Sequence, residues 1–87
     1  MSRHTIEMYD YESGDTDVFA YGYDRPCQTY FLDHKRQDSE QFEPIVGFDG
    51  VIPGNTSGLM QAFRFFGITD RVPQAHLALI AMDLPIP

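Results

Sequence analysis

The sequence predicts a small α+β domain, in which a small antiparallel β-sheet is covered on one face by one α-helix. Three observations lead to this prediction. The N-terminal quarter alternates apolar and polar residues, which is the period of a strand buried on one face. Residues 56–66 repeat apolar side chains with the period of an α-helix. A chain of 87 residues has room for one hydrophobic core, so residues 1–87 are predicted as a single domain.

The first two strands are predicted at residues 5–11 and 18–23. In the first segment Ile6 and Met8 fall on one face, and polar or aromatic residues fall on the other. The second segment is rich in β-forming residues. The polar stretch between them contains a glycine, which tolerates the positive φ of a tight turn. Together these features predict an N-terminal β-hairpin.

Three further strands are predicted, all of them short. Residues 29–33 and 45–48 are rich in apolar and β-forming side chains, and the charged residues 34–44 between them are predicted as a solvated loop. Residues 76–84 are short, apolar and flanked by prolines. Periodicity does not separate strand from helix in such a segment, and its length favours a buried C-terminal strand.

The helix at residues 56–66 has the clearest pattern in the chain. Its apolar residues lie at i, i+1, i+4 and i+7, namely Leu59, Met60, Phe63 and Phe66. Asn55, Thr56 or Ser57 can accept a hydrogen bond from the first turn, so each is a candidate N-cap. Gly67 is placed to end the helix in a left-handed conformation.

The charge balance excludes two classes of partner. Six Lys and Arg residues stand against thirteen Asp and Glu residues, which gives a net charge of −7. Direct binding to nucleic acid or to an anionic membrane surface needs clustered positive charge, so neither is expected. The sequence contains no apolar stretch of membrane-spanning length, and its single cysteine cannot form an internal disulfide. We therefore expect a protein of the reducing bacterial host cytoplasm.

No residue pattern in the sequence predicts an enzyme. His4, His34 and His76 lack the short spacings of zinc ligands, and residues 10–21 depart from the calcium-loop pattern. Cys27 has no base or oxyanion donor nearby in the sequence, and it is predicted to be a small buried apolar residue. We expect no catalytic residues, no metal and no cofactor.

Acidic residues are concentrated in the predicted hairpin, and a second group lies in the polar loop at Asp33, Asp38, Glu40 and Glu43. Such residues can simply keep a small domain soluble, or they can contact a basic groove built for phosphates. The hairpin aromatics either pack in the core or form a protein-binding face. The candidate partner-binding residues are Glu7, Asp10, Glu12, Asp15, Asp17 and Asp24, with Tyr21 and Tyr23 as aromatic anchors.

The helical and C-terminal segments carry a resemblance to a known family. The run Ser57-Gly58-Leu59-Met60-Gln61-Ala62-Phe63, then Gly67, Thr69 and Arg71, and finally Met82-Asp83-Leu84, covers about a third of the chain. This pattern is similar to the C-terminal part of a type I-E anti-CRISPR family. The run Tyr21-Gly22-Tyr23-Asp24-Arg25-Pro26, followed by Gln28-x-Tyr30-Phe31-Leu32, resembles segments of small uncharacterised bacterial proteins.

The resemblance implies an inhibitor encoded by a phage or another mobile element, which binds a protein complex and has no catalytic activity of its own. Its expected partner is the basic DNA-binding surface of a type I CRISPR surveillance complex (Cascade), where acidic mimicry of DNA would block target binding. The alternative is a small acidic interaction or regulatory module with an unknown partner and no CRISPR role. Unpaired sheet edges in so small a domain leave both a monomer and a homodimer open.

Overall fold

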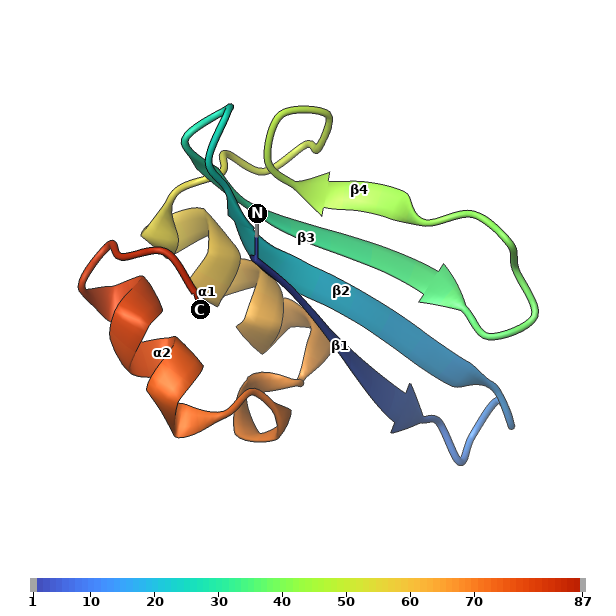
Figure 1. The fold of residues 1–87 in the computed structure, drawn as a ribbon. Coiled ribbons are helices and arrows are strands. Elements are labelled where there is room, and N and C mark those ends of the chain that lie inside the picture. The colour runs from blue at the N-terminus through green and yellow to red at the C-terminus, as the bar shows by residue number, and fades with distance from the viewer. Residues whose placement is uncertain (1, 87) are drawn as a thin grey trace.

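The computed structural model describes residues 2–86, which form a β-sheet with two α-helices packed on one of its faces (Figure 1). The sheet is antiparallel, has four strands and follows the order β1-β2-β3-β4. The elements are β1 (Ser2–Tyr9), β2 (Thr16–Asp24), β3 (Thr29–Arg36), β4 (Glu43–Val46), α1 (Thr56–Phe66), a 3-10 turn (Thr69–Arg71) and α2 (Gln74–Ala81). The predicted α+β fold class is confirmed.

The N-terminal hairpin pairs β1 with β2 in an unbroken register over all eight residues of β1. The turn closes at Asp10, whose N–H donates to the Asp15 carbonyl at 2.8 Å. Gly14 has a φ of 75° and donates its N–H to the Asp10 carbonyl. The predicted hairpin is therefore confirmed, although its first strand begins earlier and Tyr11 lies in the turn.

The third and fourth strands are displaced from their predicted positions. Residues 34–36 continue β3 although their side chains are polar, because the start of β2 supplies pairing partners such as Asp17 opposite Arg36. β4 begins at Glu43, within the segment predicted as a loop. Backbone hydrogen bonds to a neighbouring strand hold these residues in an extended conformation. Their polar side chains give no pattern from which such pairing could be predicted.

α1 coincides with the helix predicted at residues 56–66. Asn55 is its N-cap, since the side-chain Oδ1 accepts a hydrogen bond from the Gly58 N–H at 2.7 Å. At the other end Gly67 has a φ of 68° and donates its N–H to the Arg64 carbonyl at 3.1 Å. The helix lies against β3 and β4 and covers that half of the sheet.

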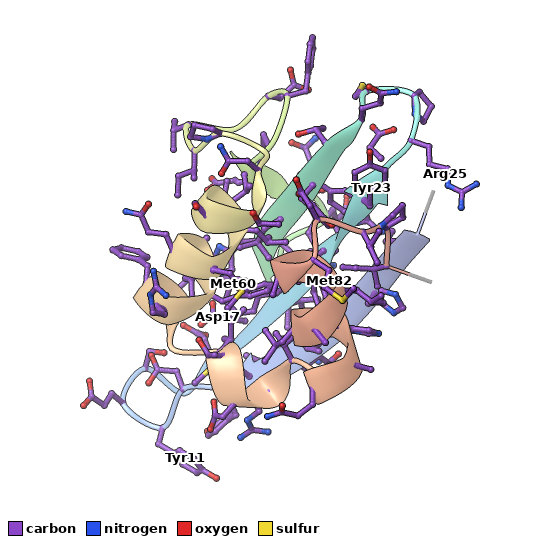
Figure 2. All side chains as sticks on the ribbon, turned by 90° about the vertical axis from the view of Figure 1, so that its left-hand side faces the viewer. Tyr11, Asp17, Tyr23, Arg25, Met60 and Met82 are labelled. Carbon is purple, nitrogen blue, oxygen red and sulfur yellow. The ribbon has the colours of Figure 1, made fainter. Side chains whose placement is uncertain are left out.

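The predicted C-terminal strand at residues 76–84 is wrong, because this segment forms the helix α2. The carbonyl of Pro73 accepts hydrogen bonds from the N–H groups of His76 and Leu77 and so starts the helix. The Gln, Ala and Leu residues that follow are good helix formers. Figure 2 shows α2 in front of β1 and β2, beside α1. Two helices therefore cover the sheet where the sequence predicted one.

The hydrophobic core lies between the sheet and the two helices. It contains Phe19, Tyr21, Tyr30, Leu32, Val46, Leu59, Ala62, Phe63, Ile68, Val72, Ile80 and Ile86. On the outer face of the sheet Val18 and Ala20 are also buried. On the same face the guanidinium carbon of Arg3 lies 5.1 Å from the centre of the Phe42 ring.

Candidate functional site

Two loops meet at one end of the sheet, the turn between β1 and β2 and the loop between β3 and β4 (Figure 1). The Gln37 N–H donates to the Thr16 carbonyl at 2.9 Å, which holds the start of the second loop beside the end of the first. Two clusters of acidic residues that are separate in the sequence therefore lie at the same end of the sheet. We call this region the acidic end, and its carboxylates belong to Asp10, Glu12, Asp15, Asp17, Asp38, Glu40 and Glu43.

Two carboxylates of the acidic end are held by basic neighbours on β3. Asp15 forms an ion pair with Arg36. Asp17 Oδ1 lies 2.9 Å from Nε2 of His34. The Asp15 contact ties the first loop to β3, and the Asp17 contact joins the start of β2 to β3.

Asp10 and Glu12 lie at the exposed tip of the hairpin. The Glu12 backbone N–H donates to Asp10 Oδ1 at 2.9 Å, and this hydrogen bond, helped by Ser13, holds the pKa of the Asp10 carboxyl below its ordinary value. Asp10 is therefore ionised at neutral pH. Glu40 is exposed in the neighbouring loop. Asp38 and Glu43 are exposed there as well, so these five carboxylates are accessible to a partner surface.

A groove of about 370 Å³ lies beside the acidic end. We call it the aromatic groove; its lining is Met8, Tyr9, Asp10, Tyr11, Glu12, Asp17, Phe19 and Phe66. The rings of Tyr9 and Tyr11 meet edge to face with their centres 4.8 Å apart. Tyr11 is 89% exposed and Tyr9 is 50% exposed, so a protein partner can reach both side chains, Tyr11 more fully.

Tyr21 was predicted as a surface anchor, and this prediction is wrong because its side chain is fully buried in the core. The strand register explains the error. Tyr21 and Phe19 share the inner face of β2, whereas Tyr9 falls on the outer face of β1. Tyr23 is half-buried, with its ring centre 5.0 Å from that of Tyr30. The hairpin aromatics therefore do not form one binding face.

Glu7 and Asp24, the other two acidic residues predicted as contacts, lie apart from the acidic end. Glu7 is on the outer face of the sheet, in one row with Val18 and Lys35. Asp24 closes β2 at the opposite end of the sheet. Its Oδ1 is buried there without a hydrogen-bond partner among residues 2–86. Four of the six predicted acidic contacts are thus brought together, and two are not.

Cys27 is exposed in the turn between β2 and β3, so the prediction of a buried apolar cysteine is wrong. Desolvation raises the pKa of its thiol, and the nearby carboxylates of Asp24 and Asp49 raise it further. A thiol with a raised pKa is a weaker nucleophile at neutral pH.

The fold also joins His4, Tyr21 and His76, which the sequence gives no reason to connect. Tyr21 Oη lies 2.8 Å from His76 Nδ1, and the His4 and His76 ring centres are 4.1 Å apart. Burial raises the pKa of Tyr21 to about 12, so its hydroxyl stays protonated at neutral pH and shares a hydrogen bond with Nδ1. Burial, together with the neighbouring His4, lowers the pKa of His76. The cluster thus joins α2 to the sheet through a hydrogen bond and ring contacts.

The register of the hairpin places His4 directly opposite Tyr21, so this half of the cluster could be derived from the sequence once the turn is located correctly. The approach of His76 depends on the position of α2. The apolar residues of this segment show no helical period, so the sequence does not predict that α2 packs beside Tyr21.

Within residues 2–86, no group of three or more His, Cys, Asp or Glu side chains is arranged to hold a metal ion. Over the same part of the chain, no helix is long and apolar enough to cross a membrane. No protein family, curated protein or solved structure matches the chain. The acidic end and the aromatic groove are therefore the features from which a function can be inferred.

Proposed function

We propose that the protein is an inhibitor that binds a type I CRISPR surveillance complex and blocks its engagement of target DNA. The observation that carries the proposal is the acidic end, where strand pairing brings seven carboxylates to one end of the domain. A DNA-binding surface holds phosphates through Lys and Arg side chains. Carboxylates presented together can pair with the Lys and Arg side chains that otherwise hold DNA phosphates. Charge complementarity also accelerates association.

The aromatic groove supports a protein partner rather than a nucleic acid. The charge around it is negative, since Asp10, Glu12 and Asp17 contribute to its lining. Tyr11 offers a large contact area with few rotatable bonds, which is typical of residues that dominate binding energy. The resemblance of the helical and C-terminal segments to a type I-E anti-CRISPR family favours the same class of partner.

The test compares two double variants that change the net charge equally. Asp10→Lys with Glu12→Lys reverses the two exposed charges at the hairpin tip. Asp49→Lys with Asp70→Lys reverses two exposed charges outside the acidic end. Each protein is added to purified type I complexes, and binding of target DNA is measured by gel shift. Phage plaquing on hosts with type I systems reports inhibition in cells.

We expect the wild type to block DNA binding and restore plaquing, the hairpin variant to lose at least tenfold in inhibition, and the control variant to keep it. Inhibition should weaken as salt rises, because exposed charges are screened beyond about 8 Å at 0.15 M ionic strength. Failure of the wild type against every type I subtype would sink the proposal. Equal loss in both variants would assign the effect to net charge instead of the acidic end.

A second candidate is a small acidic interaction module with no CRISPR role, and the aromatic groove is the observation that favours it. In that case binding to its partner would depend on apolar contact. The change Tyr11→Ala would then weaken binding more than the charge reversal at Asp10 and Glu12, and salt would have little effect. The same variants therefore separate the two functions once a binding partner has been captured.

A further inference from the structure

The two edges of the sheet differ in how they are protected against pairing with another chain. β4 has four residues, includes Pro44, and pairs with β3 through a register shift at Leu32 and Asp33. Short length, proline and a bulge are devices that block further pairing at a sheet edge. β1 has eight residues, includes neither proline nor glycine, and keeps its register with β2 throughout. β1 is therefore the edge that is open to another strand.

α2 lies over β1 and β2 (Figure 2) and also exposes apolar side chains. Ala75, Ala78 and Ala81 are exposed beside the polar Gln74, and Met82, the residue after α2, is 68% exposed. On the sheet, Ile6 and Met8 of β1 pack against the core and remain partly exposed. Two unprotected features, one strand edge and one helix face, thus occur in the same half of the molecule.

We infer that β1 pairs antiparallel with β1 of a second copy, centred on Thr5, and that the resulting homodimer has one continuous sheet. A two-fold axis at Thr5 places Arg3 of each copy opposite Glu7 of the other. Arg3, Thr5 and Glu7 lie on the same outer face of β1, since side chains alternate along a strand. Each dimer thus contains two cross-strand pairs of opposite charge.

The Arg3 side chain is 43% exposed, and within one chain its Nη1 lies 3.7 Å from Asp33 Oδ2 and its guanidinium carbon lies 5.1 Å from the centre of the Phe42 ring. Because Asp33 is on β3, this contact draws the side chain across β2. In the dimer Arg3 turns away from Asp33 to pair with Glu7 of the other copy. The Glu7 side chain is exposed on the same face.

The antiparallel arrangement also limits repulsion between two chains that each carry a charge of −7. The acidic end follows the last residue of β1, so an antiparallel partner places the two acidic ends at opposite ends of the paired strands. At about 3.4 Å per residue these ends are about 30 Å apart. That distance is well beyond the screening length of about 8 Å at 0.15 M ionic strength. A parallel pairing would bring them side by side.

The test uses charge reversal on the full chain, with mass measured by sedimentation and light scattering from micromolar to millimolar concentration. The variants are Arg3→Glu and Glu7→Arg, measured separately and as an equimolar mixture. The control is Glu40→Arg in the β3–β4 loop, which changes the net charge by the same amount as Glu7→Arg. Circular dichroism confirms that each variant is folded.

We expect the wild type and the control to reach twice the mass of one chain as concentration rises. Each reversal alone should stay monomeric, because it places like charges opposite each other at both sites. The mixture should recover the double mass, since a copy with two acidic side chains at these positions then pairs with a copy that has two basic ones. A monomeric wild type, a dimer that tolerates either reversal, or a mixture that stays monomeric would each overturn the inference, whatever the outcome of the CRISPR assays.

Discussion

Tyr21 lies in the hydrophobic core, and the hydrogen bond between its hydroxyl and His76 shows how the core accommodates a polar group. The side chain is fully buried, and its hydroxyl is satisfied by Nδ1 of His76. A buried polar group without a partner would lower the free energy of unfolding, so the contact removes a penalty as well as adding a hydrogen bond. At this scale the protein joins two distant segments by one hydrogen bond.

Replacing Tyr21 by Phe should lower the free energy of unfolding by about 1 kcal/mol, because the hydrogen bond to His76 is lost while the ring remains. Urea denaturation monitored by circular dichroism measures the change. Tyr11→Phe serves as the control, since Tyr11 is exposed in the turn and should change stability by less than about 0.5 kcal/mol. If Tyr21→Phe and Tyr11→Phe change the free energy of unfolding equally, the hydrogen bond between Tyr21 and His76 does not stabilise the fold.

Stability should fall as the pH drops below about 6.5, the ordinary pKa of histidine. The pKa of His76 is lower in the folded state than in the unfolded chain, first because of burial and then because of His4. The unfolded chain therefore binds more protons in this window, and acid favours unfolding until the pH passes the folded-state pKa. Above about 6.5 the group is neutral in both states and has no effect.

Urea denaturation at a series of pH values between neutral and about 5 measures this dependence. In His76→Gln the dependence should be smaller than in the wild type. If the slope of stability against pH is the same in both proteins, another group causes it.

At the scale of single elements, the ends of α1 show how local chemistry selects one of several candidates. Asn55, Thr56 and Ser57 all have side chains that can cap a helix, and the sequence leaves the choice open. In the structure Asn55 has an extended backbone and accepts from the Gly58 N–H. Thr56 and Ser57 already lie within the helix, so neither occupies the capping position.

Asn55→Ala should lower the free energy of unfolding by about 1 kcal/mol, since the first turn loses its cap. The matched controls Thr56→Ala and Ser57→Ala should each change it by less than about 0.5 kcal/mol. Thermal or urea unfolding of the three variants gives the comparison. The largest loss at Thr56 or Ser57 would show that the helix starts later than Asn55 implies.

For the whole molecule, the balance of charge is the dominant electrostatic property. The chain has thirteen acidic and six basic residues, so the excess of negative charge is repulsive even when evenly spread. The fold places seven of the acidic residues at one end of the domain. The basic residues Lys35 and Arg36 lie on the neighbouring strand. Repulsion among these carboxylates lowers the free energy of unfolding, and a basic partner would relieve that repulsion on binding.

Raising the ionic strength from near zero to about 0.15 M should therefore raise the melting temperature, because screening weakens repulsion within the acidic end. The double change Asp10→Lys with Glu12→Lys should reduce that salt response. Asp49→Lys with Asp70→Lys should reduce it less, although the net charge is the same. Differential scanning calorimetry at several salt concentrations measures all three. A melting temperature independent of salt would show that repulsion within the acidic end does not destabilise the fold.

The fold class, the N-terminal hairpin and α1 can all be predicted from the amino-acid sequence. The alternation around Ile6 and Met8 and the apolar stripe of residues 56–66 are periodic patterns, and such patterns report which face of an element is buried. The concentration of acidic residues in the hairpin is also a property of the sequence. Patterns of this kind are local, so they need no knowledge of which elements become neighbours.

The tertiary structure decided what depends on neighbours. Residues 77–82 are all apolar, so their pattern carries no helical or strand period. The helix packs over the half of the sheet that α1 leaves open. Tyr21 is buried and Tyr11 exposed because the strand register and the position of the turn determine which side chains face the core. The acidic end exists because antiparallel pairing places two loops together, and His76 meets Tyr21 because α2 packs there. Each of these contacts joins residues far apart in the chain, and such contacts form only when the whole domain closes around its core.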